Sequence, residues 1–177
     1  MRLAALVALA CIGLAAGVPA SAQQEQSPQA LFRGVLLADA GTASGVKRLL
    51  NTNAGFVSPA PVFADLTGDG KSDAVVMVEN GGAAGAVAAY VLTAEGSPNG
   101  DLRVAFRSQS LYQGRVRMSG PTLTVVLPQY VRGDDVCCPR RAVERDYAWD
   151  AAAKKFTRRA TRTVTAARES RSTVTRT

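Results

Sequence analysis

The chain has 177 residues, is 47% hydrophobic and contains no histidine. The missing histidine excludes Ser-His and Cys-His catalysis, imidazole metal ligands and the usual proton carrier near neutral pH. The net charge of +7 is uneven: residues 23–150 hold 12 basic and 13 acidic side chains, whereas residues 151–177 hold 8 basic and one acidic. We therefore expect a nearly neutral, non-enzymatic domain with a basic end.

Residues 1–22 have the features of a cleaved secretory signal peptide. Arg2 supplies a positive charge, residues 3–18 are apolar or small, and the ASA at 20–22 fits a cleavage site. The apolar run is shorter than the roughly 20 residues of a membrane-spanning helix. Cys11 offers an alternative, lipid attachment, but the apolar run continues past it. We expect a secreted or extracytoplasmic protein that contacts the membrane only if Cys11 is lipidated.

The mature chain begins with a polar stretch, after which apolar residues recur at helical spacing from Pro28. Ser27 is placed to cap this helix, Pro28 suits its first turn, and Gly41 follows its end. A second, shorter helix is predicted over 44–51. The pattern thus predicts one or two helices at the start of a single folded domain that spans 23–165.

From residue 62 onward, short apolar stretches alternate with turn residues, which is typical of β-strands. The run VVMV at 75–78 is continuous and predicts a strand that is buried on both faces. The predicted strands are 62–65, 73–79, 86–93, 102–107, 112–119, 123–130, 142–149 and 155–164. The expected fold class is α+β, with the helices followed by a mainly antiparallel meander of about seven to eight strands.

The stretch FADLTGDGKSDAVV at 63–76 has the spacing of a calcium loop. Calcium takes six to eight oxygen ligands, and a chain that wraps an ion offers alternate residues inward, while Gly70 permits the sharp turn. The candidate ligands are the side chains of Asp65, Thr67, Asp69 and Asp73 and the carbonyl of Lys71. We expect a structural Ca²⁺ site.

Residue 76 is valine where an EF-hand has glutamate, so this stretch is not an EF-hand. The arrangement D-x-T-x-D-G-x-x-D before an apolar strand instead resembles the calcium loops of FG-GAP/VCBS-type repeats. The alternative is a hairpin with Asp69 and Gly70 at its tip, in which Asp65 and Asp73 simply face water.

Two adjacent cysteines, Cys137 and Cys138, follow in GDDVCCPR at 133–140. Export favours oxidation, and a bond between them would close a strained eight-membered ring, because neighbouring Cα atoms lie about 3.8 Å apart. We expect this vicinal disulfide to form a rigid turn. The alternatives are free thiols, a soft-metal pair for Cu(I), or an intermolecular bridge.

The C-terminal end divides into a last strand and a tail. In the strand, Phe156, Arg158, Ala160, Arg162 and Val164 are expected to share one face. Residues 166–177 are rich in Arg, Ser and Thr and are expected to be disordered. They would either contact anionic envelope polymers or have no partner, and the lack of interleaved aromatic residues argues against nucleic acid.

The order of several motifs resembles bacterial envelope lipoproteins of the LppP/LprE type. They are DLTGDGKSDAVVMV at 65–78, GGAAGAVAAYVL at 81–92, LRVAFRSQSLYQGRVRM at 102–118, LPQYVRGDDVCCPR at 127–140 and YAWDAAAKKF at 147–156. The resemblance implies an exported or surface location and no established catalytic activity, but the chain departs from it at the lipid-attachment cysteine. We expect a structural or binding role with an unknown partner; a thiol-redox or soft-metal role for the cysteine pair is the alternative.

Overall fold

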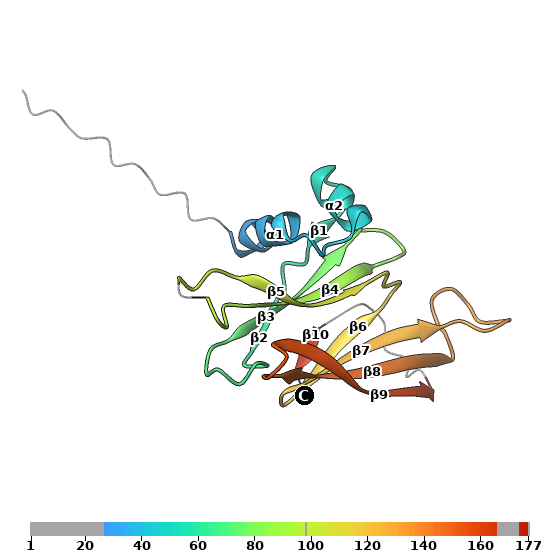
Figure 1. Ribbon diagram of the computed structural model, residues 1–177. Coiled ribbons are helices and arrows are strands. Elements are labelled where there is room, and N and C mark those ends of the chain that lie inside the picture. The colour runs from blue at the N-terminus through green and yellow to red at the C-terminus, as the bar shows by residue number, and fades with distance from the viewer. Residues whose placement is uncertain (1–26, 98, 166–173, 177) are drawn as a thin grey trace, which may run out of the picture.

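The computed structural model describes residues 27–97, 99–165 and 174–176, which form three layers (Figure 1). Two helices cover one face of a first sheet, sheet A, and a second sheet, sheet B, packs on its other face. The α+β class predicted from the sequence is therefore confirmed. No helix of the described residues is long and apolar enough to cross a membrane.

The described part of the chain forms two helices, followed by the strands of sheet A and then those of sheet B. The helices are α1 (Pro28–Ala38) and α2 (Ser44–Asn51). Sheet A contains β1 (Phe56–Val57), β2 (Val62–Ala64), β3 (Asp73–Glu79), β4 (Ala86–Thr93) and β5 (Arg103–Gln109). Sheet B contains β6 (Arg115–Ser119), β7 (Thr122–Gln129), β8 (Arg141–Asp150), β9 (Lys155–Thr165) and β10 (Val174–Arg176).

The two sheets are built mainly from consecutive antiparallel strands. In sheet A the order is β1-β3-β4-β5, with β2 also paired to β3, and in sheet B it is β10-β6-β7-β8-β9. β10 pairs parallel with β6 and is the exception. The expected meander is therefore present, but it is divided between two stacked sheets.

The core consists of two clusters, one on each face of sheet A. Val75 and Met77 of β3 point to the cluster between the sheets, and Val76 and Val78 point to the cluster under the helices. All four side chains are at most 2% exposed, which confirms that this strand is buried on both faces. The alternation follows from the two-residue period of a strand.

The loop between α1 and α2 is fixed to β5 by a bidentate ion pair. Nε and Nη2 of Arg107 donate to the two carboxylate oxygens of Asp39, at 2.9 and 2.5 Å. These hydrogen bonds from Arg107 hold the pKa of Asp39 below its usual value. A Cβ on Gly41 would lie 2.5 Å from Arg107 Nε, so only glycine leaves room for this guanidinium.

Three features of the fold differ from the sequence expectations. Strand β1 was not predicted, and Val174–Arg176 form β10 inside a tail that was expected to be disordered. The rest of that tail, residues 166–173 and 177, lies outside the described residues, as do the predicted signal peptide and Cys11.

The third difference is a β-bulge between β8 and β9. Tyr147 pairs with Arg158, but its neighbour Asp146 pairs with Ala160, so Arg159 is the extra residue. One extra residue moves every following side chain to the opposite face. The expectation that residues 156–164 present one continuous face is therefore wrong: Phe156 packs on the core between the sheets, whereas Arg162 pairs with Glu144 and Asp146 on the other face.

Candidate functional site

Exposed apolar side chains gather around the loop between β7 and β8. The described residues include seven exposed large hydrophobic side chains, and four of them lie in or beside this loop. These are Tyr112 (43% exposed), Tyr130 (37%), Val131 (36%) and Val136 (64%). Together with Cys137 and Cys138 we call them the disulfide patch. Large apolar groups gathered on a surface are typical of contact sites.

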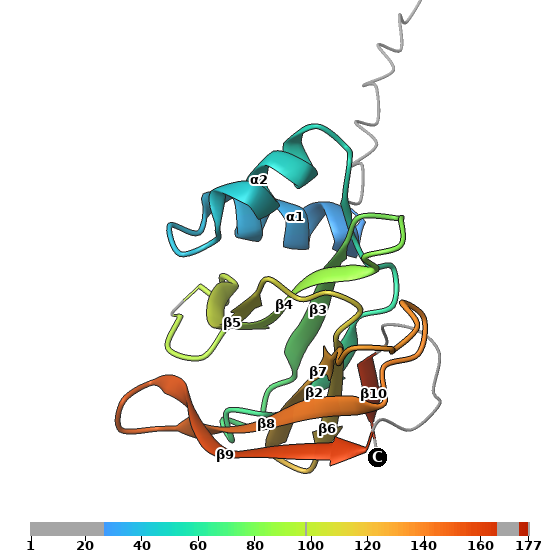
Figure 2. The same ribbon diagram turned by 90° about the vertical axis from the view of Figure 1, so that its right-hand side faces the viewer.

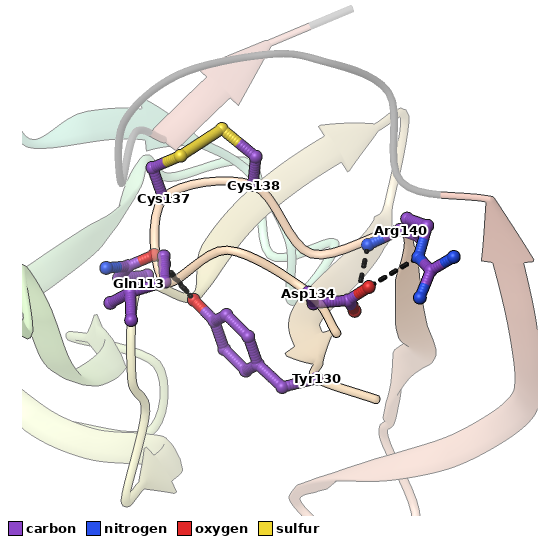
Figure 3. Close-up of a disulfide and its surroundings, with 7 residues drawn as sticks. Gln113, Tyr130, Asp134, Cys137, Cys138 and Arg140 are labelled. Atoms are coloured by element: carbon purple, nitrogen blue, oxygen red, sulfur yellow. Dashed lines mark hydrogen bonds and ion pairs between the residues drawn. A yellow bond between two sulfur atoms is a disulfide. The ribbon is translucent and has the colours of Figure 1, made fainter. Parts of the chain in front are cut away.

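The disulfide forms the tip of this loop (Figure 3). Cys137 and Cys138 are joined to each other, which confirms the vicinal disulfide expected from the sequence. The amide of Cys138 donates to the carbonyl of Asp135 at 3.0 Å and closes a four-residue turn around Val136 and Cys137. Both cysteines are exposed, so the sulfur atoms and the Val136 side chain are presented together.

The base of the loop is held together by Asp134. Its side chain has no exposed surface, and its carboxylate accepts from the amides of Val131 at 3.0 Å and of Arg140 at 3.2 Å. The guanidinium of Arg140 adds an ion pair and donates to the carbonyl of Arg132 at 3.3 Å. One carboxylate thus joins the two ends of the loop at its base.

Tyr130 ties the same loop to the rest of the molecule. Its hydroxyl lies 2.7 Å from Gln113 Oε1 and 2.9 Å from the carbonyl of Val136, and its single proton can be donated to either. Gln113 in turn donates to the carbonyls of Ala83 and Ala84, at 2.9 and 2.8 Å. The disulfide loop is therefore connected through the β5–β6 link to the β3–β4 loop of sheet A.

The electrostatics of the patch follow from these contacts. The hydrogen bond from the Val131 amide, followed by that from Arg140, lowers the pKa of Asp134 and keeps it ionised. Partial burial raises the pKa of Tyr130, with smaller effects of Tyr112 and Asp134. The tyrosine rings meet edge to face with centroids 5.9 Å apart. The patch consequently presents aromatic, aliphatic and sulfur surface, with Asp134 turned inward, while the charged side chains of Arg132 and Asp135 beside it are exposed.

The aspartate loop takes a different form from the predicted cation site. Asp73 is 1% exposed, and its Oδ2 accepts from the amides of Leu66 at 2.8 Å and Thr67 at 3.0 Å. Asp65 accepts from the amides of Gly68 at 2.6 Å and Gly70 at 3.0 Å. Each carboxylate therefore closes part of the turn itself.

The remaining predicted ligands lie in the same loop and have their own partners there. Asp69 is exposed and accepts from the Lys71 amide at 2.9 Å, and the Thr67 hydroxyl lies 3.5 Å from Asp73 Oδ1. Within the described ranges, no three Asp, Glu, Cys or His side chains form a group that could hold a metal ion. This arrangement does not fit a cage of three carboxylates, and calcium binding stays a prediction. Of the alternative, the hairpin between β2 and β3 is present and Asp65 is exposed, but the expectation that Asp73 faces water is wrong.

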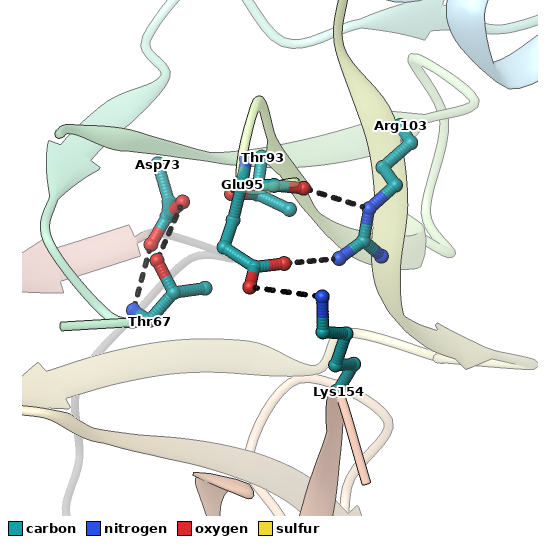
Figure 4. A network of polar contacts seen from close by, with 6 residues as sticks. All are labelled: Thr67, Asp73, Thr93, Glu95, Arg103 and Lys154. Atoms are coloured by element: carbon teal, nitrogen blue, oxygen red, sulfur yellow. Dashed lines mark hydrogen bonds and ion pairs between the residues drawn. The ribbon is translucent and has the colours of Figure 1, made fainter. Parts of the chain in front are cut away.

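A second polar network lies beside the aspartate loop and joins the two sheets (Figure 4). Glu95, in the β4–β5 loop, pairs with Arg103 at 2.7 Å and lies 4.0 Å from Nζ of Lys154 in the β8–β9 turn. Arg103 also lies over the Trp149 ring, 5.9 Å from its centroid. The network holds the turn of sheet B against sheet A, which is a structural role.

Sequence reasoning found the cysteine pair but missed the groups that support it. Tyr130 and Asp134 belong to the quoted stretch at 127–140 and Gln113 to the one at 102–118, but the sequence assigned them no role, because their hydrogen bonds are visible only in the fold. The G-D-D before the cysteines was interpreted as a turn signal and as part of the family resemblance, but not as the support of the loop. Comparisons with protein-family models, curated proteins and solved structures find no match to this chain, so the resemblance to LppP/LprE-type proteins stays a prediction.

Proposed function

We propose that this protein is an exported, non-catalytic domain of the cell envelope that binds a partner through the disulfide patch. The observation that carries the proposal is the placement of four exposed apolar side chains in or beside a loop that is fixed at its base and oxidised at its tip. Oxidised cysteines are typical of extracytoplasmic compartments, and the signal-like residues 1–22 support export.

The physical case for binding is one of pre-organisation. Ordering a loop on association costs conformational entropy, and a loop that is already fixed avoids much of that cost. Here the Asp134 hydrogen bonds and the Tyr130 hydroxyl fix the loop, while Val136 remains 64% exposed. An exposed valine held in one position is suited to enter an apolar recess on a partner.

The test compares two variants in capture from an envelope extract. Val136→Asp puts a charge at the centre of the patch, and Leu31→Asp does the same at an exposed leucine (45%) on α1, far from the patch in sequence. We expect a partner that is captured by the wild type and by Leu31→Asp but lost with Val136→Asp. Equal capture by both variants would contradict the proposal.

The exposure of both cysteines favours a second candidate, a thiol-redox or soft-metal role. Two thiols of a reductant would reduce the Cys137–Cys138 bond to two cysteine thiols and leave as their own disulfide. This role predicts that a mild dithiol reductant opens the bond, so that both cysteines then alkylate, and that the reduced protein binds Cu(I) stoichiometrically. A bond that resists the reductant, with no alkylation and no Cu(I) binding, would favour the binding role.

A further inference from the structure

The outer edge of sheet B is formed by one long strand. β9 spans Lys155–Thr165 and, among the described strands, pairs with β8 alone (Figure 2). Every second residue of such an edge strand directs its backbone N–H and C=O groups away from the sheet. β9 therefore offers unpaired donors and acceptors at the spacing of a β-strand.

Most of the strand is also open to solvent. Its side chains are exposed except those of Phe156, Thr157 and Val164, which are half-buried. Its distal part, residues 160–165, consists of alanine, arginine, valine and three threonines, and valine and threonine favour extended backbone. Beyond the bulge at Arg159, the strand has the composition and exposure that allow another strand to pair with it.

The charge along β9 is of one sign. The strand contains four basic residues and no acidic one. Arg162 is neutralised by ion pairs with Glu144, at 2.6 Å, and Asp146. Lys155, Arg158 and Arg159 form no ion pair among the described residues, although Asp150 lies opposite Lys155 in the register of β8 against β9. Three exposed cations therefore lie along the proximal half of the edge.

We propose that β9 is an interaction surface that receives an acidic, extended polypeptide segment as an added strand of sheet B. A polypeptide is the class of partner whose backbone matches the unpaired edge groups, and acidic side chains would complement the three cations that form no ion pair. A second copy of this chain fits less well, because pairing two β9 strands would bring six such cations together. This surface is distinct from the disulfide patch.

The experiment uses three short capped peptides with the purified protein. The first alternates Glu with Thr and Val, the second has the same side chains but N-methylated alternate amides, and the third carries Lys in place of Glu. Affinity is measured by fluorescence anisotropy, and the site is located by amide hydrogen exchange. We expect the first peptide to bind and to slow exchange in residues 160–165, and the other two to bind at least about tenfold more weakly.

Charge-reversal variants of the protein test whether the β9 cations, and not net charge, attract the acidic peptide. Reversing Lys155, Arg158 and Arg159 to Glu should weaken the first peptide about tenfold. The same reversal at three exposed cations elsewhere (Arg48, Lys71 and Arg132) should leave its affinity within about twofold.

Three results would overturn the inference. The N-methylated peptide could bind as tightly as the first, which would show that charge attraction, and not backbone hydrogen bonding to β9, accounts for the affinity. Light scattering could show a concentration-dependent dimer whose contact protects β9 from exchange, which would assign the edge to a second copy. The first peptide could fail to bind to the wild-type protein at all.

Discussion

Replacing Asp73 by alanine tests whether the aspartate loop is stabilised by its own hydrogen bonds or requires a bound ion. The Asp73 carboxylate is buried and accepts from the amides of Leu66 and Thr67. Alanine would leave both amides without an acceptor, at about 1–3 kcal/mol each. We therefore expect Asp73→Ala to lower the free energy of unfolding by about 2–6 kcal/mol, a large part of the 5–15 kcal/mol typical of a domain.

The assay is urea unfolding in the presence of EGTA, so that no calcium contributes. Asp69→Ala is the matched control, because Asp69 is exposed and accepts only from the Lys71 amide; we expect it to cost less than about 0.5 kcal/mol. The reasoning would be refuted if Asp73→Ala cost less than about 1 kcal/mol in EGTA. It would also be refuted if Asp73→Ala and Asp69→Ala lowered the free energy of unfolding equally in calcium and neither lowered it in EGTA.

Three further predictions concern the ion, pH and packing. If the sequence-predicted calcium site forms, millimolar Ca²⁺ should raise the Tm relative to EGTA in the wild type but not in Asp69→Ala; equal Tm values would reduce the stretch to a turn. Arg107 lowers the pKa of Asp39 in the folded state below its value in the unfolded state. The Asp39–Arg107 pair therefore stabilises the fold above the unfolded-state pKa, and this stabilisation is lost as the pH falls through the folded-state pKa. The stability difference between the wild type and Asp39→Asn should therefore shrink below about pH 4 in urea titrations, and a constant difference would contradict this. Gly41→Ala should cost about 1–3 kcal/mol, because its Cβ would lie 2.5 Å from Arg107 Nε, and an unchanged unfolding midpoint would show that the guanidinium moves freely.

Local sequence signals were sufficient for most of the secondary structure. Ser27 accepts from the Ala30 amide at 3.2 Å and caps α1 as its position predicted. The continuous apolar run in β3 correctly indicated burial on both faces. These features depend on the spacing of neighbouring residues, which is visible in a single sequence.

What the sequence could not supply depends on contacts between distant residues. β1 has two residues, and its pairing with β3 spans more than twenty positions. The bulge at Arg159 becomes visible only in the register of β8 against β9, and it reverses the face of every residue after it. At the candidate site, Tyr130 and Gln113 meet only because two loops from different sheets are adjacent.

Site-specific photo-crosslinking in living cells tests the central claim most directly. A photoreactive residue would replace Val136 in one protein and Tyr112 in another, and Leu31 in a third as the control; all three native side chains are exposed. The binding role predicts the same crosslinked partner from positions 136 and 112 and none from position 31. A partner that crosslinks equally from position 31, or no crosslink from position 136, would contradict it.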